Sequence, residues 1–137
     1  MTTGTDMDGL KVLIVDDEPF MRRTIKAMLR VVGRFLVEEA DDGDAALALL
    51  PTFRPDIVLC DIQMPRVDGL QFVRQLRNHR EGDLRETPVL MLTVSADEAT
   101  ILDATRLKVS GYLVKPVSPK LLGSHISAIV RTHPAEP

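Results

Sequence analysis

Residues 12–18 read Val12-Leu13-Ile14-Val15-Asp16-Asp17-Glu18, a short apolar run followed directly by three acidic residues. The run is too short for a helix and contains β-branched side chains, which favours a strand buried on both faces. Similar short runs recur along the chain, at residues 35–37, 57–60, 89–92 and 112–114. The sequence therefore predicts five strands.

Longer stretches with helical spacing separate these runs. The clearest covers residues 19–32, where Ile25, Leu29 and Val32 fall on one face while most of the basic residues fall off it. Four further helices are predicted, at residues 44–50, 70–78, 96–107 and 118–131. The apolar stripe of residues 96–107 is thin, and a helix that buries little is a candidate for movement.

The alternation of strands and helices is typical of the α/β class. We expect a doubly wound, five-stranded parallel sheet covered on both faces by five helices, because right-handed crossovers place helices on both sides. In such folds ligands bind beyond the carboxyl ends of the strands. The predicted domain covers residues 10–132, after a flexible extension at 1–9 and before a short tail at 133–137.

Length and charge exclude several kinds of protein. A chain of 137 residues with 45% hydrophobic residues has the size and apolar content of one folded domain. Its net charge of −3 lacks the basic excess of nucleic-acid-binding modules. No apolar run approaches the roughly 18 to 20 residues of a membrane span, and the N-terminus lacks a secretory signal pattern. We therefore expect a cytoplasmic protein with no direct nucleic-acid contact and no membrane insertion.

Thiol and imidazole chemistry offers no obvious site. Cys60 is the only cysteine, so the chain forms no intramolecular disulfide and has no thiolate cluster for zinc. The histidines, His79, His125 and His133, lie far apart in the sequence and show no ligand spacing. Neither residue type suggests a metal centre.

Polar residues follow four of the predicted strands. Asp16 and Asp17 come after the first, Asp61 after the third, Thr93 after the fourth and Lys115 after the fifth. Each of these residues, considered alone, has an ordinary structural explanation. Asp is a common turn former or helix N-cap, and Lys is commonly a solvated surface charge. Their joint occurrence at one end of four strands favours a functional site instead.

Three carboxylates gathered at one edge require protons or a cation. Two carboxylates about 4 Å apart repel by roughly 4 kcal/mol at an effective dielectric near 20. Oxygen ligands without Cys or His favour Mg²⁺, Mn²⁺ or Ca²⁺, and open positions for water and a phosphoryl oxygen favour Mg²⁺. One carboxylate could then act as a nucleophile, with Lys115 and Thr93 binding phosphoryl oxygens.

Rival phosphate chemistries fit the sequence less well. The first strand is not followed by a Gly-x-x-x-x-Gly-Lys-Ser/Thr loop, which excludes a P-loop nucleotidase. A flavodoxin-like cofactor site would need a Ser/Thr/Gly-rich loop where this chain has three acids. An aspartyl phosphatase of the haloacid dehalogenase type would need a second Asp two places after the nucleophile, where Gln63 stands.

The ordered motifs resemble the receiver domain of bacterial two-component response regulators, and among them the single-domain chemotaxis (CheY-like) type. The resemblance spans about residues 10–132. Its markers are Val15-Asp16-Asp17-Glu18, Met21-Arg22-Arg23, Glu39-Ala40-Asp41-Asp42-Gly43, Asp61-Ile62-Gln63-Met64-Pro65, Asp68-Gly69, Leu92-Thr93 and Gly111-Tyr112-Leu113-Val114-Lys115-Pro116. The family's flavodoxin-like strand order, 2-1-3-4-5, is expected here on that basis.

The resemblance implies a role for each residue at the strand ends. Asp61 would be the phosphoacceptor, receiving a phosphoryl group from a histidine kinase or a histidine phosphotransfer protein. Asp17 and Asp61 would ligate Mg²⁺ directly, Asp16 mostly through water, and Gln63 through its backbone carbonyl, with Mn²⁺ as a substitute ion. Lys115 would pair with the phosphoryl group, and the family keeps the Lys115-Pro116 peptide bond in cis.

The resemblance also implies a conformational switch. A phosphoryl group adds about −1.5 to −2 charges, which would draw Thr93 inward and let Tyr112 move into the vacated space. The protein-binding face expected to change comprises the predicted fourth helix, fifth strand and fifth helix. Val94 and Val117 depart from the small and the aromatic residues that are frequent at these family positions.

Two alternatives remain open at this stage. The first is a pseudo-receiver that is not phosphorylated and acts only as a protein-interaction module. The second is a metal-dependent aspartyl phosphatase. The preferred interpretation is a non-enzymatic phosphoacceptor that assists its own phosphorylation and dephosphorylation, either as a monomer or as a weak phosphorylation-dependent dimer.

Overall fold

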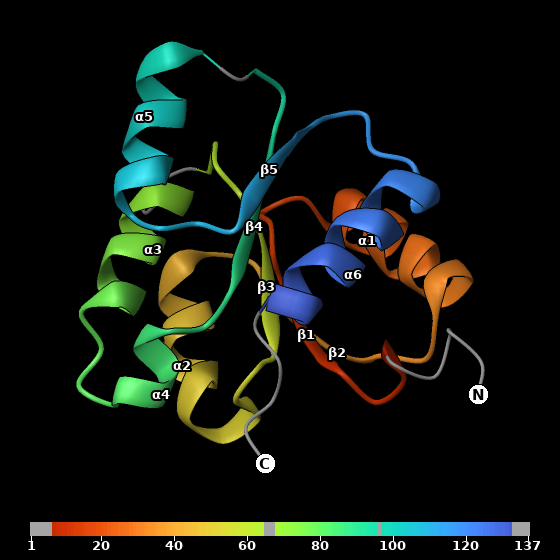
Figure 1. The fold of residues 1–137 in the computed structure, drawn as a ribbon, viewed down its shortest axis with the longest axis horizontal. Helices are drawn as coiled ribbons and strands as arrows, with labels where there is room; N and C mark the ends of the chain where they lie inside the picture. Colours follow the sequence, from red (N-terminus) through yellow and green to blue (C-terminus); the bar gives the residue numbers. More distant parts are fainter. Residues whose placement is uncertain (1–6, 65–67, 96, 133–137) are drawn as a thin grey trace.

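The protein is a three-layer α/β domain (Figure 1). The computed structural model describes residues 7–64, 68–95 and 97–132, so residues 1–6 of the predicted extension, the tail at 133–137 and Ala96 lie outside the described residues. The strands are β1 (Lys11–Val15), β2 (Leu36–Ala40), β3 (Ile57–Asp61), β4 (Val89–Thr93) and β5 (Gly111–Val114). The helices are α1 (Pro19–Val32), α2 (Gly43–Phe53), α3 (Gly69–Arg77), α4 (Gly82–Arg85), α5 (Glu98–Arg106) and α6 (Pro119–Thr132).

The five strands form one parallel sheet in the order β2-β1-β3-β4-β5. The predicted fold class and the strand order implied by the resemblance are therefore confirmed. The register pairs Val15 with Ala40 and Cys60, and pairs Asp61 with Leu92. The carboxyl ends of β1, β3 and β4 consequently lie at one edge of the sheet.

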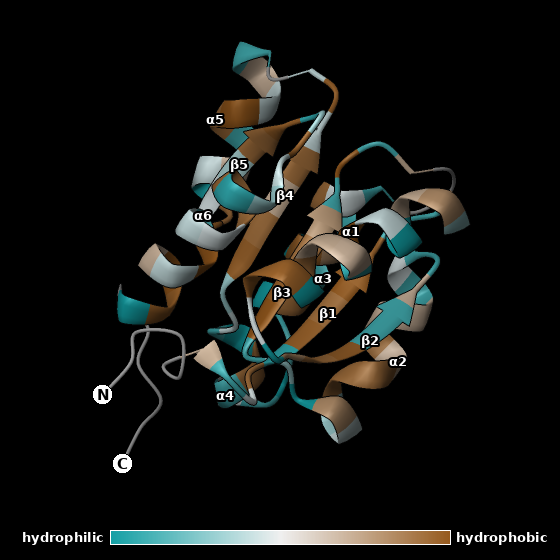
Figure 2. Cartoon of the chain, turned by 90° about the vertical axis from the view of Figure 1, so that its right-hand side faces the viewer, coloured by the Kyte–Doolittle hydropathy of each residue, from teal (hydrophilic) through white to brown (hydrophobic). Residues whose placement is uncertain are grey.

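Two hydrophobic clusters cover the faces of the sheet. On one face α1 and α6 pack through Ile25, Leu29 and Ile126, while the opposite face carries α2, α3 and α4, with Phe72 and Leu76 fully buried. The strands form an apolar layer between the helices (Figure 2). The near-continuous burial of β1, β3 and β4 explains why their sequences are almost entirely apolar.

The prediction of five helices was wrong, because the described residues contain six. The additional helix, α4, has four residues, and Leu84 is its one buried side chain. Such a short element shows no apolar periodicity, so its sequence resembles a polar loop. The helix that was predicted fourth is therefore α5, and the one predicted fifth is α6.

Two element boundaries also differ from the sequence-based expectation. The second strand covers Leu36–Ala40 rather than 35–37. It includes Glu38, which is exposed, and Glu39, which is half-buried on the other face of this edge strand. Helix α2 continues past residue 50, with Pro51 inside it, to Phe53. Among the described helices, none combines the length and apolar character needed to cross a membrane.

Candidate functional site

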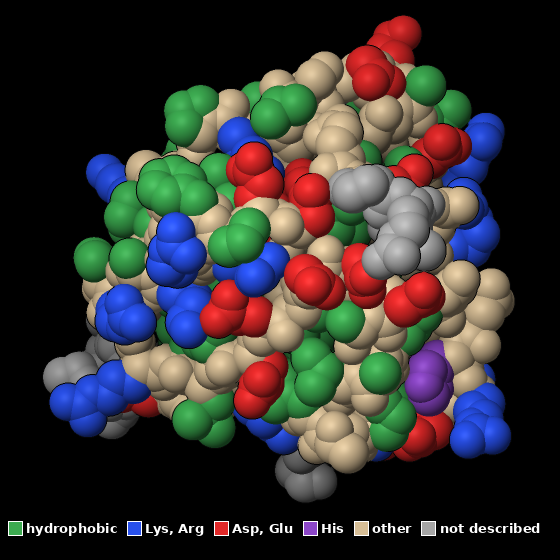
Figure 3. Space-filling model, turned by 180° about the vertical axis from the view of Figure 1, so that it is seen from behind, with side chains coloured by type: hydrophobic (Ala, Val, Ile, Leu, Met, Phe, Trp, Pro, Cys, Tyr) green, Lys and Arg blue, Asp and Glu red, His purple; other side chains and the backbone are tan. Residues whose placement is uncertain are grey.

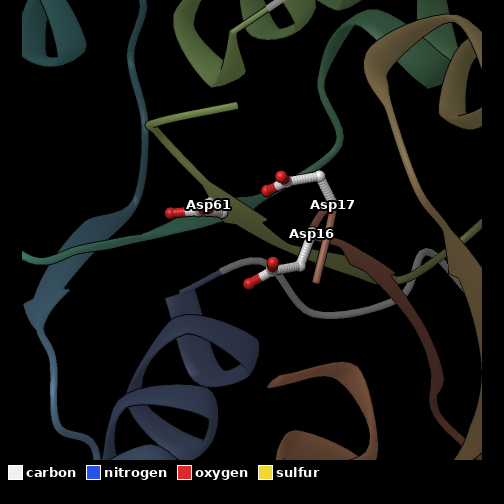
Figure 4. Close-up of side chains that lie close together, drawn as sticks. All are labelled: Asp16, Asp17 and Asp61. Carbon is white, nitrogen blue, oxygen red and sulfur yellow. The ribbon is translucent and has the colours of Figure 1, made fainter. Parts of the chain in front are cut away.

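Three acidic side chains converge where β1 and β3 end (Figure 4). Asp16 and Asp17 follow β1 directly, and Asp61 is the last residue of β3. One carboxylate oxygen from each of the three lies within 4.8 Å of the others. Asp16 and Asp61 are buried, whereas Asp17 is half-buried. The structure thus brings together the three carboxylates that the sequence placed at strand ends.

Lys115 joins this acidic cluster from the far side of β4. Its Nζ lies 3.4 Å from Asp16 Oδ2 and 3.3 Å from Asp61 Oδ1. The Lys115 backbone N–H donates to the Thr93 carbonyl at 2.7 Å, and the peptide bond to Pro116 is cis. One ammonium against three carboxylates leaves a net charge of −2 when all four groups are ionised, which matches the charge of a divalent cation.

Burial makes Asp61 an unusual carboxylate. The loss of solvation raises the pKa of Asp61 from its ordinary 3.8 to about 6, an effect that Lys115 partly opposes and that Asp16 reinforces. An ionised Asp61 is therefore poorly solvated, and a cation bound beside it would favour the ionised form. Such a carboxylate is suited to act as a nucleophile once a cation is present.

A set of supporting contacts fixes Asp16. Its Oδ1 accepts the Glu18 backbone N–H at 2.9 Å, which leaves Oδ2 directed at Lys115. Arg22 donates to the Asp16 carbonyl at 2.7 Å and to Glu39 Oε1 at 2.9 Å. Lys26 binds the other Glu39 oxygen, and this hydrogen bond lowers the pKa of Glu39. Sequence reasoning assigned no role to Arg22 or Glu39, because side-chain contacts between separate elements leave no local pattern.

Residues 12–127 match the protein-family model described as the response regulator receiver domain. The chain belongs to this family. It is 39% identical over 120 residues to the chemotaxis protein CheY of Pseudomonas aeruginosa, covering 88% of this chain and 95% of that protein. Its structure also resembles that of the Vibrio cholerae chemotaxis protein CheY4, with a TM-score of 0.81 and 32% identity over 88% of this chain and 98% of that one.

Longer regulators contain a similar receiver. The probable transcriptional regulator ycf27 of Guillardia theta is 40% identical to this chain over 121 residues. The match covers 88% of this chain but 45% of that protein, so the chain spans about half the length of this relative. Receiver domains are phosphoacceptors rather than conventional enzymes, and they bind Mg²⁺ in general.

The hydroxyl group of Thr93 forms hydrogen bonds with the loop that follows β4. Thr93, buried at the end of β4, donates its hydroxyl to the Ser95 carbonyl at 2.7 Å and accepts the Ser95 N–H at 3.1 Å. Gln63 Oε1 lies 3.2 Å from the same hydroxyl. Tyr112 on β5 is 41% exposed. Thr93 is therefore buried and hydrogen-bonded to the loop that follows β4, whereas Tyr112 is partly exposed.

Close packing at the start of α3 sets the position of Asp61. Gly69 donates its N–H to the Ile62 carbonyl at 2.9 Å, and a Cβ at Gly69 would overlap the Asp61 backbone oxygen. A capping box between Asp68 and Gln71 fixes the first turn of the helix. The sequence motif Asp68-Gly69 thus has a steric reason, because only glycine fits against the end of β3.

Proposed function

We propose that Asp61 of this receiver accepts a phosphoryl group from the phosphohistidine of a histidine kinase or a histidine phosphotransfer protein. The observation that carries the proposal is the contact of Lys115 with Asp61 inside a cluster of three carboxylates. An aspartate that only forms a turn or caps a helix does not require a buried lysine beside it, so these ordinary roles do not explain the contact of Asp61 with Lys115. The net charge of the cluster and its position beyond the strand ends point to phosphoryl chemistry.

The donor set fits Mg²⁺. The three side chains that converge among the described residues all offer carboxylate oxygens, which suit a hard divalent cation. We assign Asp17 and Asp61 as direct ligands, Asp16 as a ligand mostly through water, and the Gln63 backbone carbonyl as a further ligand, with Mn²⁺ as a substitute. When bound, the ion would neutralise negative charge on both the carboxylates and the incoming phosphoryl group.

The residues of the chain have distinct parts in the transfer. An Asp61 carboxylate oxygen attacks the phosphorus, and the new O–P bond forms as the donor's N–P bond breaks. The N–P electron pair remains on the leaving imidazole, which takes up a proton from solvent. Lys115, already 3.3 Å from Asp61, stabilises the negative charge of the transferred group.

The phosphoryl group would then change the surface formed by α5, β5 and α6. Thr93 would exchange its Ser95 contact for a phosphoryl oxygen, and Tyr112 would turn inward. Apolar side chains that are about half exposed lie on this surface, including Leu102 at 50% and Val114 at 48%. We propose that a downstream protein binds there, that the receiver assists its own dephosphorylation, and that it acts in the cytoplasm as a monomer or a weak phosphorylation-dependent dimer.

Intact-mass spectrometry tests the phosphoacceptor role. The full chain is incubated with a small acyl-phosphate donor, with Mg²⁺ or with a chelator. We expect one added phosphoryl group with Mg²⁺, little without it, and none in Asp61→Asn under either condition. Absence of the adduct in the wild-type chain, both with this donor and with a phosphorylated histidine kinase, would leave only a protein-interaction role.

A further inference from the structure

A positively charged hollow lies at the edge of the sheet opposite the phosphoacceptor site. It has a volume of about 340 Å³ and is lined by residues that precede β4 and β5, among them Pro88 and Lys108. Asp61 and Thr93 stand at the other, carboxyl ends of the strands. The hollow is lined by residues at the ends of α3, α4 and α5, and it is therefore separate from the acidic cluster.

The hollow has an excess of positive charge. Four cations line it, Arg77, Arg85, Arg106 and Lys108, against the single acid Glu86. Among the described residues, none of these four cations forms a salt bridge with a carboxylate. The ends of α3 and α5 contribute roughly −0.5 charge each, which leaves a surplus of about two positive charges. A chain with a net charge of −3 thus carries a local site of opposite sign.

Arg77 fixes the shape of the hollow. Its Nε donates to the Leu107 carbonyl at 2.9 Å, and its Nη2 donates to the Lys108 carbonyl at 3.1 Å. Its Nη1 donates to the carbonyls of Arg85 and Thr87, both at 2.8 Å. One side chain thereby joins the segments that precede β4 and β5. Arg77 thus fixes the backbone of the segment that carries Arg106 and Lys108. The side chains of Arg106 and Lys108 are exposed and accessible to a ligand.

We propose that this basic hollow binds a small ligand that carries two adjacent phosphate groups. Guanidinium groups bind phosphate oxygens in pairs, and the exposed guanidinium of Arg106 lines the hollow together with the exposed ammonium of Lys108. The volume falls in the range of small-molecule sites. Leu107 and Pro88 add apolar surface suited to a ring attached to the phosphates. The shared chemistry is a diphosphate, supplied either by inorganic pyrophosphate or by a nucleoside diphosphate.

Heteronuclear NMR titration of the ¹⁵N-labelled full chain tests this site. The titration is done with a chelator and without Mg²⁺, so that the acidic cluster repels the anion. One arm uses inorganic pyrophosphate and the other uses adenosine diphosphate. We expect saturable amide shifts at residues 85–87 and 106–108, with little change around Asp61. Tighter binding in the second arm would assign part of the site to the nucleoside.

Two substitutions and one control make the test specific. Arg106→Gln and Lys108→Asn each remove an exposed cation, and Asn tolerates the positive φ of 59° at Lys108. Each is expected to weaken binding about tenfold, the effect of losing one charge-assisted hydrogen bond. Arg131→Gln, at the equivalent last turn of α6, should leave binding unchanged. The proposal would be overturned if the amide shifts did not saturate with ligand concentration, or if all three substitutions weakened ligand binding equally.

Discussion

Lys115 Nζ lies 3.3 Å from Asp61 Oδ1 and also 3.4 Å from Asp16 Oδ2, so one ammonium is shared by two buried carboxylates at the ends of different strands. This sharing leaves neither carboxylate fully compensated, because a single positive charge faces three negative ones. The cluster therefore carries uncompensated negative charge, which a divalent cation would neutralise.

Removing the ammonium should raise the pKa of Asp61 further. Lys115 opposes the effect of burial on this carboxyl, so Lys115→Met should move the pKa above the wild-type value of about 6. Carbon-detected NMR titration of the Asp61 carboxyl in metal-free protein measures the change. The control is Lys120→Met, an exposed lysine on α6. An unchanged Asp61 titration in Lys115→Met would refute the shared ion pair.

The charge of Asp61 should destabilise the metal-free fold above about pH 6. Its pKa is raised from 3.8 to about 6 on folding, so the folded state holds the proton more tightly and loses stability as pH rises through this interval. The loss amounts to at most about 3 kcal/mol. Asp61→Asn should therefore be more stable than wild type in urea unfolding at pH 7.5, with the difference vanishing near pH 4. Parallel stability curves for the two proteins would contradict this explanation.

Mg²⁺ should stabilise the wild-type chain more than an equal ionic strength of NaCl does. Binding to the folded state alone adds about 2.7 kcal/mol when the ion is at 100 times its Kd. Asp17→Asn should abolish most of this gain, since Asp17 is the most accessible carboxylate of the cluster. Asp103→Asn, an exposed acid on α5, serves as the matched control. Equal Mg²⁺ responses in thermal unfolding of both variants would remove the cluster as the binding site.

Tyrosine fluorescence should report the proposed switch directly. The chain has one tyrosine and no tryptophan, so the signal comes from Tyr112 alone. Phosphorylation should reduce acrylamide quenching, because a side chain now 41% exposed would turn inward. Asp61→Asn treated with the same donor is the control. Unchanged quenching in a sample that mass spectrometry shows to be fully phosphorylated would exclude Tyr112 as the moving residue.

The glycine at the start of α3 should tolerate no side chain. Gly69→Ala places a Cβ against the Asp61 backbone oxygen and should cost about 2–4 kcal/mol in urea unfolding. Gly82→Ala, whose Cβ would meet only the flexible end of Arg85, should change stability by less than about 1 kcal/mol. Similar losses in both variants would show that the close approach at Gly69 is not limiting.

The sequence predicted the parts of the fold whose signal is local. Buried strands such as β1 and β3 are almost entirely apolar, and α1 has a clear apolar face, so their positions followed from the pattern. Helix α4 was missed because four residues are too few for a period. Edge strand β2 was predicted too short because Glu38 and Glu39 are charged and interrupt the apolar run.

The gathering of the strand-end carboxylates and Lys115 at one edge of the sheet was predictable from the sequence, but their individual contacts were not. Strand-end positions identified Asp16, Asp61, Thr93 and Lys115, since parallel strands place their carboxyl ends at one edge. The sharing of Lys115 between two carboxylates depends on side-chain reach across β4, which no sequence spacing encodes. The same is true of Arg77, whose four carbonyl partners lie 8 to 31 residues away along the chain.

Chemical mapping of the phosphorylated residue tests the central claim most directly. The chain is phosphorylated by a phosphohistidine donor with Mg²⁺, reduced with borohydride to convert an acyl phosphate of aspartate into homoserine, and digested for peptide mass spectrometry. The account predicts homoserine at position 61 and at no other aspartate. Homoserine at position 16 or 17, or a stable phosphate ester elsewhere with residue 61 unmodified, would contradict it.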